Sequence, residues 1–269
     1  MGYLNRTNSV SDGQPITLYQ FALGNNQKVW RFTDADQDIT VNGEQWLATA
    51  ISDSGRKTGD NLRVSLPSDN AVAQLFRGIA PSQSVTLTVM RLHWQDNEIR
   101  VVWIGTIIEA KRPETHQTEL ISAGLSATMR SAGLRLMWGR SCPYSLYDSD
   151  CKVDKAKFAV AGLRVQAVTG TTITVGFPSQ LPDNWFNAGF IEWTDSLGVR
   201  EVRAVTVHHN NLLTIMGGTQ KISVGTLITV YPGCDGQVKT CRDKFNNVLN
   251  FGGIPHMPNK SPYDGSRIF

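Results

Sequence analysis

All four cysteines of this 269-residue chain lie in two short polar loops, and no other feature of the sequence constrains the fold as strongly. Cys142 and Cys151 lie in WGRSCPYSLYDSDCKVD, and Cys234 and Cys241 lie in PGCDGQVKTC, near the C-terminus. Cysteines that serve only as small hydrophobic side chains are found in apolar segments. Because these four are confined to polar loops, we predict that the two loops meet and that their thiols form one site.

The spacing of the cysteines leaves more than one kind of site open. Eight residues separate Cys142 from Cys151 and six separate Cys234 from Cys241, whereas zinc sites usually have about two to four. An iron–sulfur cluster is larger than one ion and suits wider spacings, and the pair Cys142-Pro143 is also found in bacterial ferredoxins. Two disulfides would need an oxidising compartment, and MGYLNRTNSV is no secretory signal. We favour a metal or cluster site over two disulfides or unrelated free thiols.

The segment around Cys241 predicts a short helix. Thr240 and Asp243 resemble a capping box that opens the helix, and Gly252 would end it. Cys241 would then lie in the first turn, where free backbone N–H groups stabilise a thiolate. The apolar face of this helix would consist of Phe245, Val248 and Leu249.

Composition excludes several classes of protein. Charged residues make up 18% of the chain, which is low for a free-standing protein and favours a component of an assembly. No apolar run is long enough to cross a bilayer, and a net charge of +3 does not indicate specific nucleic-acid binding.

Six basic residues flank the cysteines and would offset the negative charge of four thiolates: Arg140, Lys152, Lys155, Lys239, Arg242 and Lys244.

Alternating apolar residues and turn signals predict a mainly β fold. ITLYQFAL and KVWRFT flank a turn at Gly24-Asn25-Asn26, and DITV and EQWLATA flank Asn42-Gly43, so we expect two hairpins. Residues 61–66 predict a strand that ends at Pro67. The most hydrophobic run, VVWIGTII, is typical of a central core strand.

One short helix is predicted within this β-rich half, from Ser68 to Ile79, with Ser68 or Asp69 as its cap. Its apolar positions have helical spacing, and Pro81 prevents it from continuing. The positions are Val72, Leu75, Phe76 and Ile79.

The strand pattern after the first cysteine pair predicts a second β unit. Short strands at regular spacing between residues 158 and 231 indicate a small barrel or sandwich inserted between the cysteine loops. We therefore expect four parts. The first is an N-terminal arm (1–14) that is ordered only when another part of the structure binds it. The others are a β-barrel-like domain with a short helix (15–130), a cysteine domain (131–157 and 232–269) and the inserted barrel (158–231).

No catalytic constellation stands out. The sequence contains no HExxH, GxSxG, P-loop or GxGxxG motif. His208 and His209 precede a predicted turn at Asn210-Asn211, where exposed polar side chains are expected. A nucleophile pair of Cys142 with His256 is conceivable, but four matched cysteines do not suit a single reactive thiol. We predict that the chain is not an enzyme; a redox or hydrolytic enzyme is the weaker alternative.

RSCPYSLYDSDCKVD and YPGCDGQVKTCRDKFNNVLNFGGIPHMP resemble the C-terminal half of phage tail tip hub proteins. This family includes the minor tail protein L of phage lambda and the hub proteins of Pseudomonas siphophages and gene transfer agents. ITLYQF, VWRFTDADQDITVNGEQWLA and LRVSLPSDNAVAQLF are similar to its N-terminal half. The resemblance covers nearly the whole chain, and the four-cysteine pattern with GGIPHMP is its specific part.

The resemblance implies a structural protein of the virion's tail tip, made in the host cytoplasm. It implies an iron–sulfur cluster, expected to be 4Fe-4S, bound by Cys142, Cys151, Cys234 and Cys241. The alternative, which the spacing of the cysteines leaves open, is a binding module stapled together by zinc. The segment from about residue 15 to about residue 125 would form a homotrimeric ring. The ring would join the distal tail protein to the central fibre or receptor-binding protein, around the C-terminus of the tape measure protein.

Overall fold

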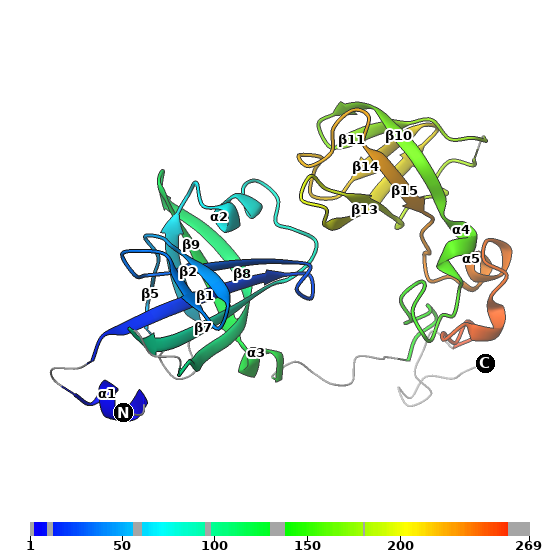
Figure 1. The fold of residues 1–269 in the computed structure, drawn as a ribbon. Helices are drawn as coiled ribbons and strands as arrows, with labels where there is room; N and C mark the ends of the chain where they lie inside the picture. Colours follow the sequence, from blue (N-terminus) through cyan, green and yellow to red (C-terminus); the bar gives the residue numbers. More distant parts are fainter. Residues whose placement is uncertain are drawn as a thin grey trace. The chain divides into compact units, whose positions relative to one another are not determined.

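The computed structural model describes residues 3–9, 13–55, 61–94, 98–129, 138–179 and 181–257. The chain divides into two compact units, Met1–Ser131 (unit 1) and Ala132–Phe269 (unit 2). Both units consist mainly of strands with a few short helices, which confirms the predicted fold class (Figure 1). Among the described helices, none is both long and apolar enough to span a membrane.

Unit 1 contains a nine-stranded sheet with the order β3-β4-β2-β1-β7-β8-β9-β6-β5. All neighbouring strands are antiparallel except β2 and β4. The elements of this unit are α1 (Tyr3–Thr7), β1 (Pro15–Leu23), β2 (Lys28–Thr33), β3 (Ile39–Val41), β4 (Glu44–Ala48), β5 (Ser52–Asp53), β6 (Leu62–Pro67), α2 (Ala71–Leu75), β7 (Val85–His93), β8 (Arg100–Glu114), β9 (Gln117–Gly124) and α3 (Leu125–Met129).

Both predicted hairpins of unit 1 are confirmed. The turn between β1 and β2 has positive φ at Gly24, Asn25 and Asn26, and the turn between β3 and β4 has φ of 51° at Asn42 and 80° at Gly43. Glycine and asparagine tolerate this left-handed backbone region better than other residues. The turn residues therefore fix where each strand ends.

The helix α2 is shorter than predicted and has a different cap. It covers only Ala71–Leu75, and Asn70 caps it by accepting a hydrogen bond from the Val72 N–H at 2.9 Å. Ser68 is not the cap: its hydroxyl lies 3.0 Å from the Thr118 hydroxyl, and its N–H donates to the carbonyl oxygen of His116 (2.9 Å), which extends the pairing of β6 with β9. The pairing across the sheet therefore reaches Ser68, the residue at which the prediction began the helix.

The hydrophobic strand β8 lies between β7 and β9 in the sheet, but the prediction of a core strand is wrong for one of its faces. Gly105 and Ile107 are buried, whereas Ile104 and Ile108 are 43% and 58% exposed. Successive residues of a strand point to opposite faces of the sheet. One face of β8 thus covers the core, and the other leaves apolar side chains in solvent.

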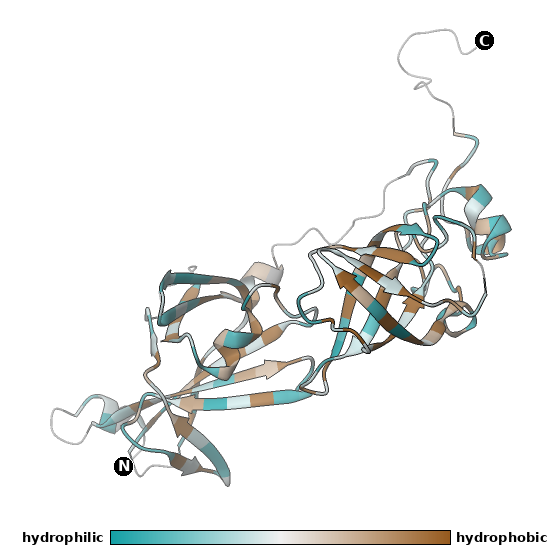
Figure 2. Ribbon diagram, turned by 90° about the horizontal axis from the view of Figure 1, so that it is seen from above, coloured by the Kyte–Doolittle hydropathy of each residue, from teal (hydrophilic) through white to brown (hydrophobic). Residues whose placement is uncertain are grey.

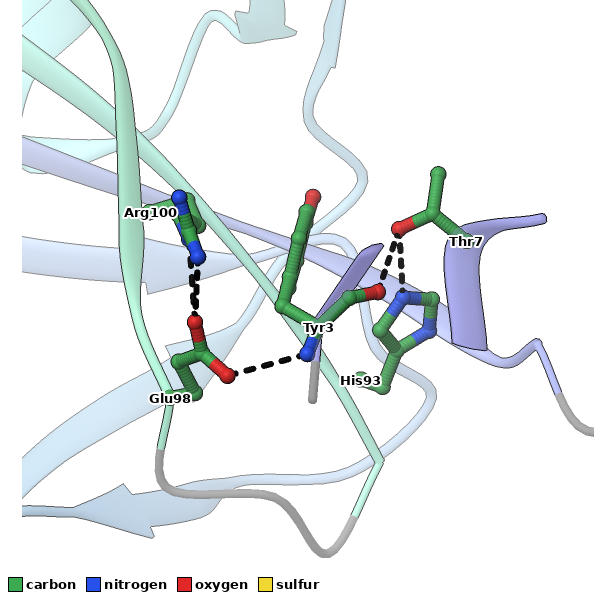
Figure 3. A network of polar contacts seen from close by, with 5 residues as sticks. All are labelled: Tyr3, Thr7, His93, Glu98 and Arg100. Atoms are coloured by element: carbon green, nitrogen blue, oxygen red, sulfur yellow. Dashed lines mark hydrogen bonds and ion pairs between the residues drawn. The ribbon is translucent and has the colours of Figure 1, made fainter. Parts of the chain in front are cut away.

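The N-terminal arm is held against unit 1 by a small polar network (Figure 3). The Tyr3 N–H donates to Glu98 Oε2 (2.9 Å), and Thr7 Oγ1 lies 3.0 Å from His93 Nε2. The Arg100 guanidinium, which is paired with Glu98, lies 5.5 Å from the centre of the Tyr3 ring. These contacts anchor α1 to residues of β7, of β8 and of the segment before β8.

Unit 2 contains a closed barrel of six antiparallel strands with the order β10-β11-β14-β13-β12-β15. The strands carry both hydrophobic and hydrophilic residues (Figure 2), and side chains such as Ile173, Ile191 and Leu213 are fully buried. Its elements are α4 (Lys155–Phe158), β10 (Val160–Thr169), β11 (Thr172–Val175), β12 (Phe190–Thr194), β13 (Arg200–His209), β14 (Leu212–Ile215), β15 (Leu227–Tyr231), α5 (Val238–Asp243) and the 3-10 turn η1 (Val248–Asn250).

His208 corrects a prediction, because its side chain is fully buried rather than exposed. The register of β13 against β14 shifts between Val205 and Val207, so the alternation changes phase and His208 points inward. Its ring lies edge-on to Phe177 and Phe186, at centroid distances of 5.6 and 4.9 Å. Burial lowers the pKa of His208.

Candidate metal centre

The two cysteine loops lie against each other in unit 2. The Cys142 N–H donates to the carbonyl oxygen of Gly236 (2.8 Å). The Tyr147 hydroxyl donates to the carbonyl oxygen of Pro232 at 2.9 Å. These bonds join segments that the whole barrel separates in the sequence. All four sequence-predicted site residues therefore lie in one region of the unit.

The four cysteines are free thiols with unequal burial: Cys151 and Cys241 are buried, and Cys142 and Cys234 are half-buried. Burial raises the pKa of Cys234 and of Cys241, and the charges of neighbouring cysteines raise both further. Cys142 and Cys151 are among these neighbours in both cases. In this conformation, no group of three or more histidine, cysteine or acidic side chains among the described residues is close enough to hold a single metal ion.

Backbone N–H groups point at the sulfurs of the two half-buried cysteines. Gly252 N donates to Cys142 Sγ and Gly236 N donates to Cys234 Sγ, both at 3.4 Å. Gly236 has φ of +72°, which favours glycine, and a Cβ at Gly252 would lie 2.4 Å from the Tyr144 ring. The loops thus supply four thiols, two of them with a backbone N–H beside the sulfur, a donor set that fits a thiolate-bound metal or cluster.

Tyr147 joins the first cysteine loop to the barrel. Its ring makes edge-on contacts with Phe190 (6.1 Å), Tyr231 (6.3 Å) and Phe245 (6.4 Å). Phe190 lies on β12 and Tyr231 on β15, and the buried Phe245 follows α5. Burial raises the pKa of the Tyr147 phenol above its ordinary value. The cysteine loops and the barrel of unit 2 therefore share one aromatic contact region.

The helix beside Cys241 starts earlier than predicted. It covers Val238–Asp243 after the cap residue Gln237, and Thr240 donates its hydroxyl hydrogen to Asp235 instead of capping. The Cys241 N–H is bonded to the carbonyl oxygen of Gln237 (3.0 Å), so Cys241 does not lie among free N–H groups. The predicted lowering of its pKa by the helix start is wrong, because burial raises that pKa.

The apolar face predicted for this helix is also only partly formed. Phe245 is buried, but Val248 and Leu249 belong to the 3-10 turn η1 and are 42% and 100% exposed. The chain leaves the helix after Asp243, and Asn246 has a positive φ of 48°. These two side chains therefore point into solvent.

The flanking basic residues differ in what they contact. Lys155 is paired with Glu192, and Arg242 with Asp243 at 2.7 Å, so carboxylates already compensate both charges. Lys244 donates to the carbonyl oxygens of Trp185 (2.5 Å) and Gly233 (2.7 Å). Burial lowers the pKa of Lys244 to about 8, and the nearby Cys234 opposes this shift. Lys244 thus bridges the second cysteine loop and the segment before β12.

His256, the histidine considered as a partner of Cys142 in a nucleophile pair, is exposed. None of the polar contacts found within the described ranges joins it to Cys142. Two features were not predicted from the sequence: the burial of Cys151 and Cys241, and the hydrogen bonds of Asn247 with both of these residues. The only available signal was the asparagine-rich stretch FNNVLN after Cys241.

Comparison with known proteins places the chain among phage proteins. Residues 16–154, more than half of the chain, match the family described as baseplate hub protein, N-terminal attachment domain. Residues 184–261 match the phage conserved hypothetical protein BR0599. The first match includes Cys142 and Cys151, and the second includes Cys234 and Cys241.

One solved structure shares the fold. A chain of the virion of a native gene transfer agent (GTA) particle aligns with a TM-score of 0.75 and 20% identity, covering 100% of this chain and 99% of that one. None of the curated proteins matches this sequence.

Proposed function

This chain belongs to the phage baseplate hub protein family, and we propose that it joins the distal tail protein, at the end of the tail tube, to the central fibre or receptor-binding protein. As a family member, it is a structural component of the tail baseplate and hence of a virion. We propose further that its role is that of the minor tail protein L of phage lambda. The C-terminus of the tape measure protein would then lie inside the hub. It includes no catalytic step.

We propose that unit 1 forms a homotrimeric ring through residues of about 15–125. An uncharged strip on β8 and β7 supports this, because Ile104 and Ile108 are exposed and Thr106, Thr86 and Thr88 lie on the same strip. Exposed apolar surfaces are often covered in assemblies. Trimerisation is tested by light scattering during size-exclusion chromatography of wild type and of Ile104→Lys. We expect trimers for wild type and smaller species for the variant; a wild-type monomer would contradict the ring.

We propose further that Cys142, Cys151, Cys234 and Cys241 hold a structural iron–sulfur cluster, of the 4Fe-4S type. When bound, the cluster would supply four bonds to sulfur that tie residues 131–157 to residues 232–269 and hold both ends of the barrel at 158–231. Closing so long a loop contributes to folding free energy. The observation that carries the proposal is the convergence of four free thiols, two of which have a backbone N–H beside the sulfur.

The test is elemental analysis with an absorption spectrum on full-length protein purified without oxygen. We expect brown protein with about four iron and four sulfide per chain, as the 4Fe-4S cluster requires. Colourless protein with about one zinc per chain would replace the cluster by a zinc staple. Protein that binds neither iron nor zinc, and that keeps its stability after Cys234→Ala, would refute the site.

A further inference from the structure

We infer that Asn247 is the positioning residue for the two buried thiols of the cysteine site, Cys151 and Cys241. The inference rests on the proposed function, because it assigns a role at the proposed metal or cluster site. Asn247 itself is not one of the four proposed ligands. Its role would be to hold the ligands of both loops in one arrangement.

Asn247 contacts one cysteine from each loop. Its side-chain Nδ2 donates to the carbonyl oxygen of Cys151 (2.6 Å) and lies 3.8 Å from the Cys151 sulfur. Its backbone oxygen accepts a hydrogen bond from Cys241 Sγ (3.3 Å), and its N–H donates to the carbonyl oxygen of Cys241 (3.0 Å). The side chain thus serves one loop and the backbone serves the other.

A neighbouring residue fixes the orientation of the Asn247 amide. Asn250 Nδ2 donates to Asn247 Oδ1 at 2.7 Å, so the Asn247 oxygen is used as an acceptor and its nitrogen must face Cys151. An aspartate has the same shape but only acceptor oxygens when ionised. It would direct an oxygen at the carbonyl oxygen and sulfur of Cys151, which are both electron-rich. This position therefore requires an amide.

The four cysteines differ in how much they depend on a side chain. The sulfurs of Cys142 and Cys234 have backbone donors, Gly252 and Gly236, which remain whatever side chains are present. Cys241 bonds to the Asn247 backbone, whereas Cys151 depends on the Asn247 side chain, so a single substitution can disturb Cys151 directly. Mutation of a group that orients a metal ligand typically lowers metal affinity by roughly 10–100-fold.

The test compares wild type with Asn247→Asp, Asn247→Gln and the matched control Leu249→Ala. Leu249 lies in the same turn and its side chain is fully exposed. In reduced, metal-free full-length protein, the rate at which each thiol reacts with DTNB reports how firmly it is held. We expect two fast and two slow thiols in wild type. Asn247→Asp should speed the reaction of the slow Cys151 thiol roughly 5- to 10-fold, the effect of losing about one hydrogen bond. The Cys241 thiol, which bonds to the Asn247 backbone, should change less.

The second readout uses protein loaded with iron and sulfide or with zinc alone. We expect Asn247→Asp to lose metal to a chelator roughly 10–100-fold faster than wild type. Asn247→Gln, which keeps the amide, should lie between the two, and Leu249→Ala should match wild type.

Two outcomes separate this inference from the proposed function. If wild type binds no metal, the proposed function fails, and the thiol rates alone still decide whether Asn247 holds the buried pair. If wild type binds metal but Asn247→Asp changes neither thiol reactivity nor metal loss, the role of Asn247 is refuted and the proposed function stands.

Discussion

Replacing Gly233 by alanine should separate the second cysteine loop from the segment that precedes β12. A Cβ at this position would lie 2.1 Å from Asn187 O, 2.2 Å from Ala188 C and 2.3 Å from Gly189 N. All three are backbone atoms, so no side-chain rotation relieves the overlap. The two segments must move apart.

The magnitude follows from two contributions. Overpacking of this kind costs about 1–3 kcal/mol. Lys244 spans the same two segments through Gly233 O and Trp185 O, and losing one hydrogen bond to a charged group costs about 1.5–3 kcal/mol. Together they give about 2.5–6 kcal/mol. At about 3 °C per kcal/mol, the Tm of unit 2 should fall by roughly 8–18 °C.

The assay is thermal unfolding of the full chain, followed by tryptophan fluorescence, with Gly236→Ala as the control. Gly236 lies in the same loop with φ of +72°, and the nearest atom to its added Cβ is 3.5 Å away. The control therefore suffers only left-handed backbone strain, about 1–2 kcal/mol. Equal Tm shifts for the two variants would refute the reasoning, because the close approach at Gly233 would then have no energetic effect.

Other substitutions test the corrected features of the fold. Asn70→Ala should destabilise unit 1 by about 1 kcal/mol through loss of the α2 cap, whereas the exposed Asp69→Ala should have little effect in urea unfolding; the opposite ranking would restore the predicted cap. His208 has a lowered pKa because it is buried, so the unfolded chain binds the proton more strongly and stability should fall as pH drops below about 6.5, by at most about 1.4 kcal/mol per pH unit. His208→Phe should remove that part of the pH dependence between pH 7 and 5, and an unchanged profile would show that another group causes it.

Turn chemistry explains why much of the β structure was predictable. The hairpins at Asn42-Gly43 and at Gly24–Asn26, and the six barrel strands, depend on alternation and on residues that accept positive φ. These properties belong to a few adjacent residues. The membership of the hub family was similarly visible in the cysteine pattern.

The predictions that failed depended on competition between neighbouring or distant segments. Ser68 has the right side chain for a helix cap, but its N–H pairs with His116 across the sheet. The side chains of β13 alternate between the two faces until the register against β14 shifts, and this shift turns His208 inward. In both cases pairing with another strand, distant in sequence for Ser68 and adjacent for His208, overrode the local preference.

The sequence by itself determined the strands, the turns and the confinement of all cysteines to two polar loops, because backbone preference and side-chain alternation act over a few residues. Only the tertiary structure decided that Asn247 lies between these loops, that Cys151 and Cys241 are the buried thiols, and that one apolar face of β8 stays in solvent. Burial and long-range hydrogen bonds depend on which segments meet. That outcome is a property of the packed chain and not of any single stretch of it.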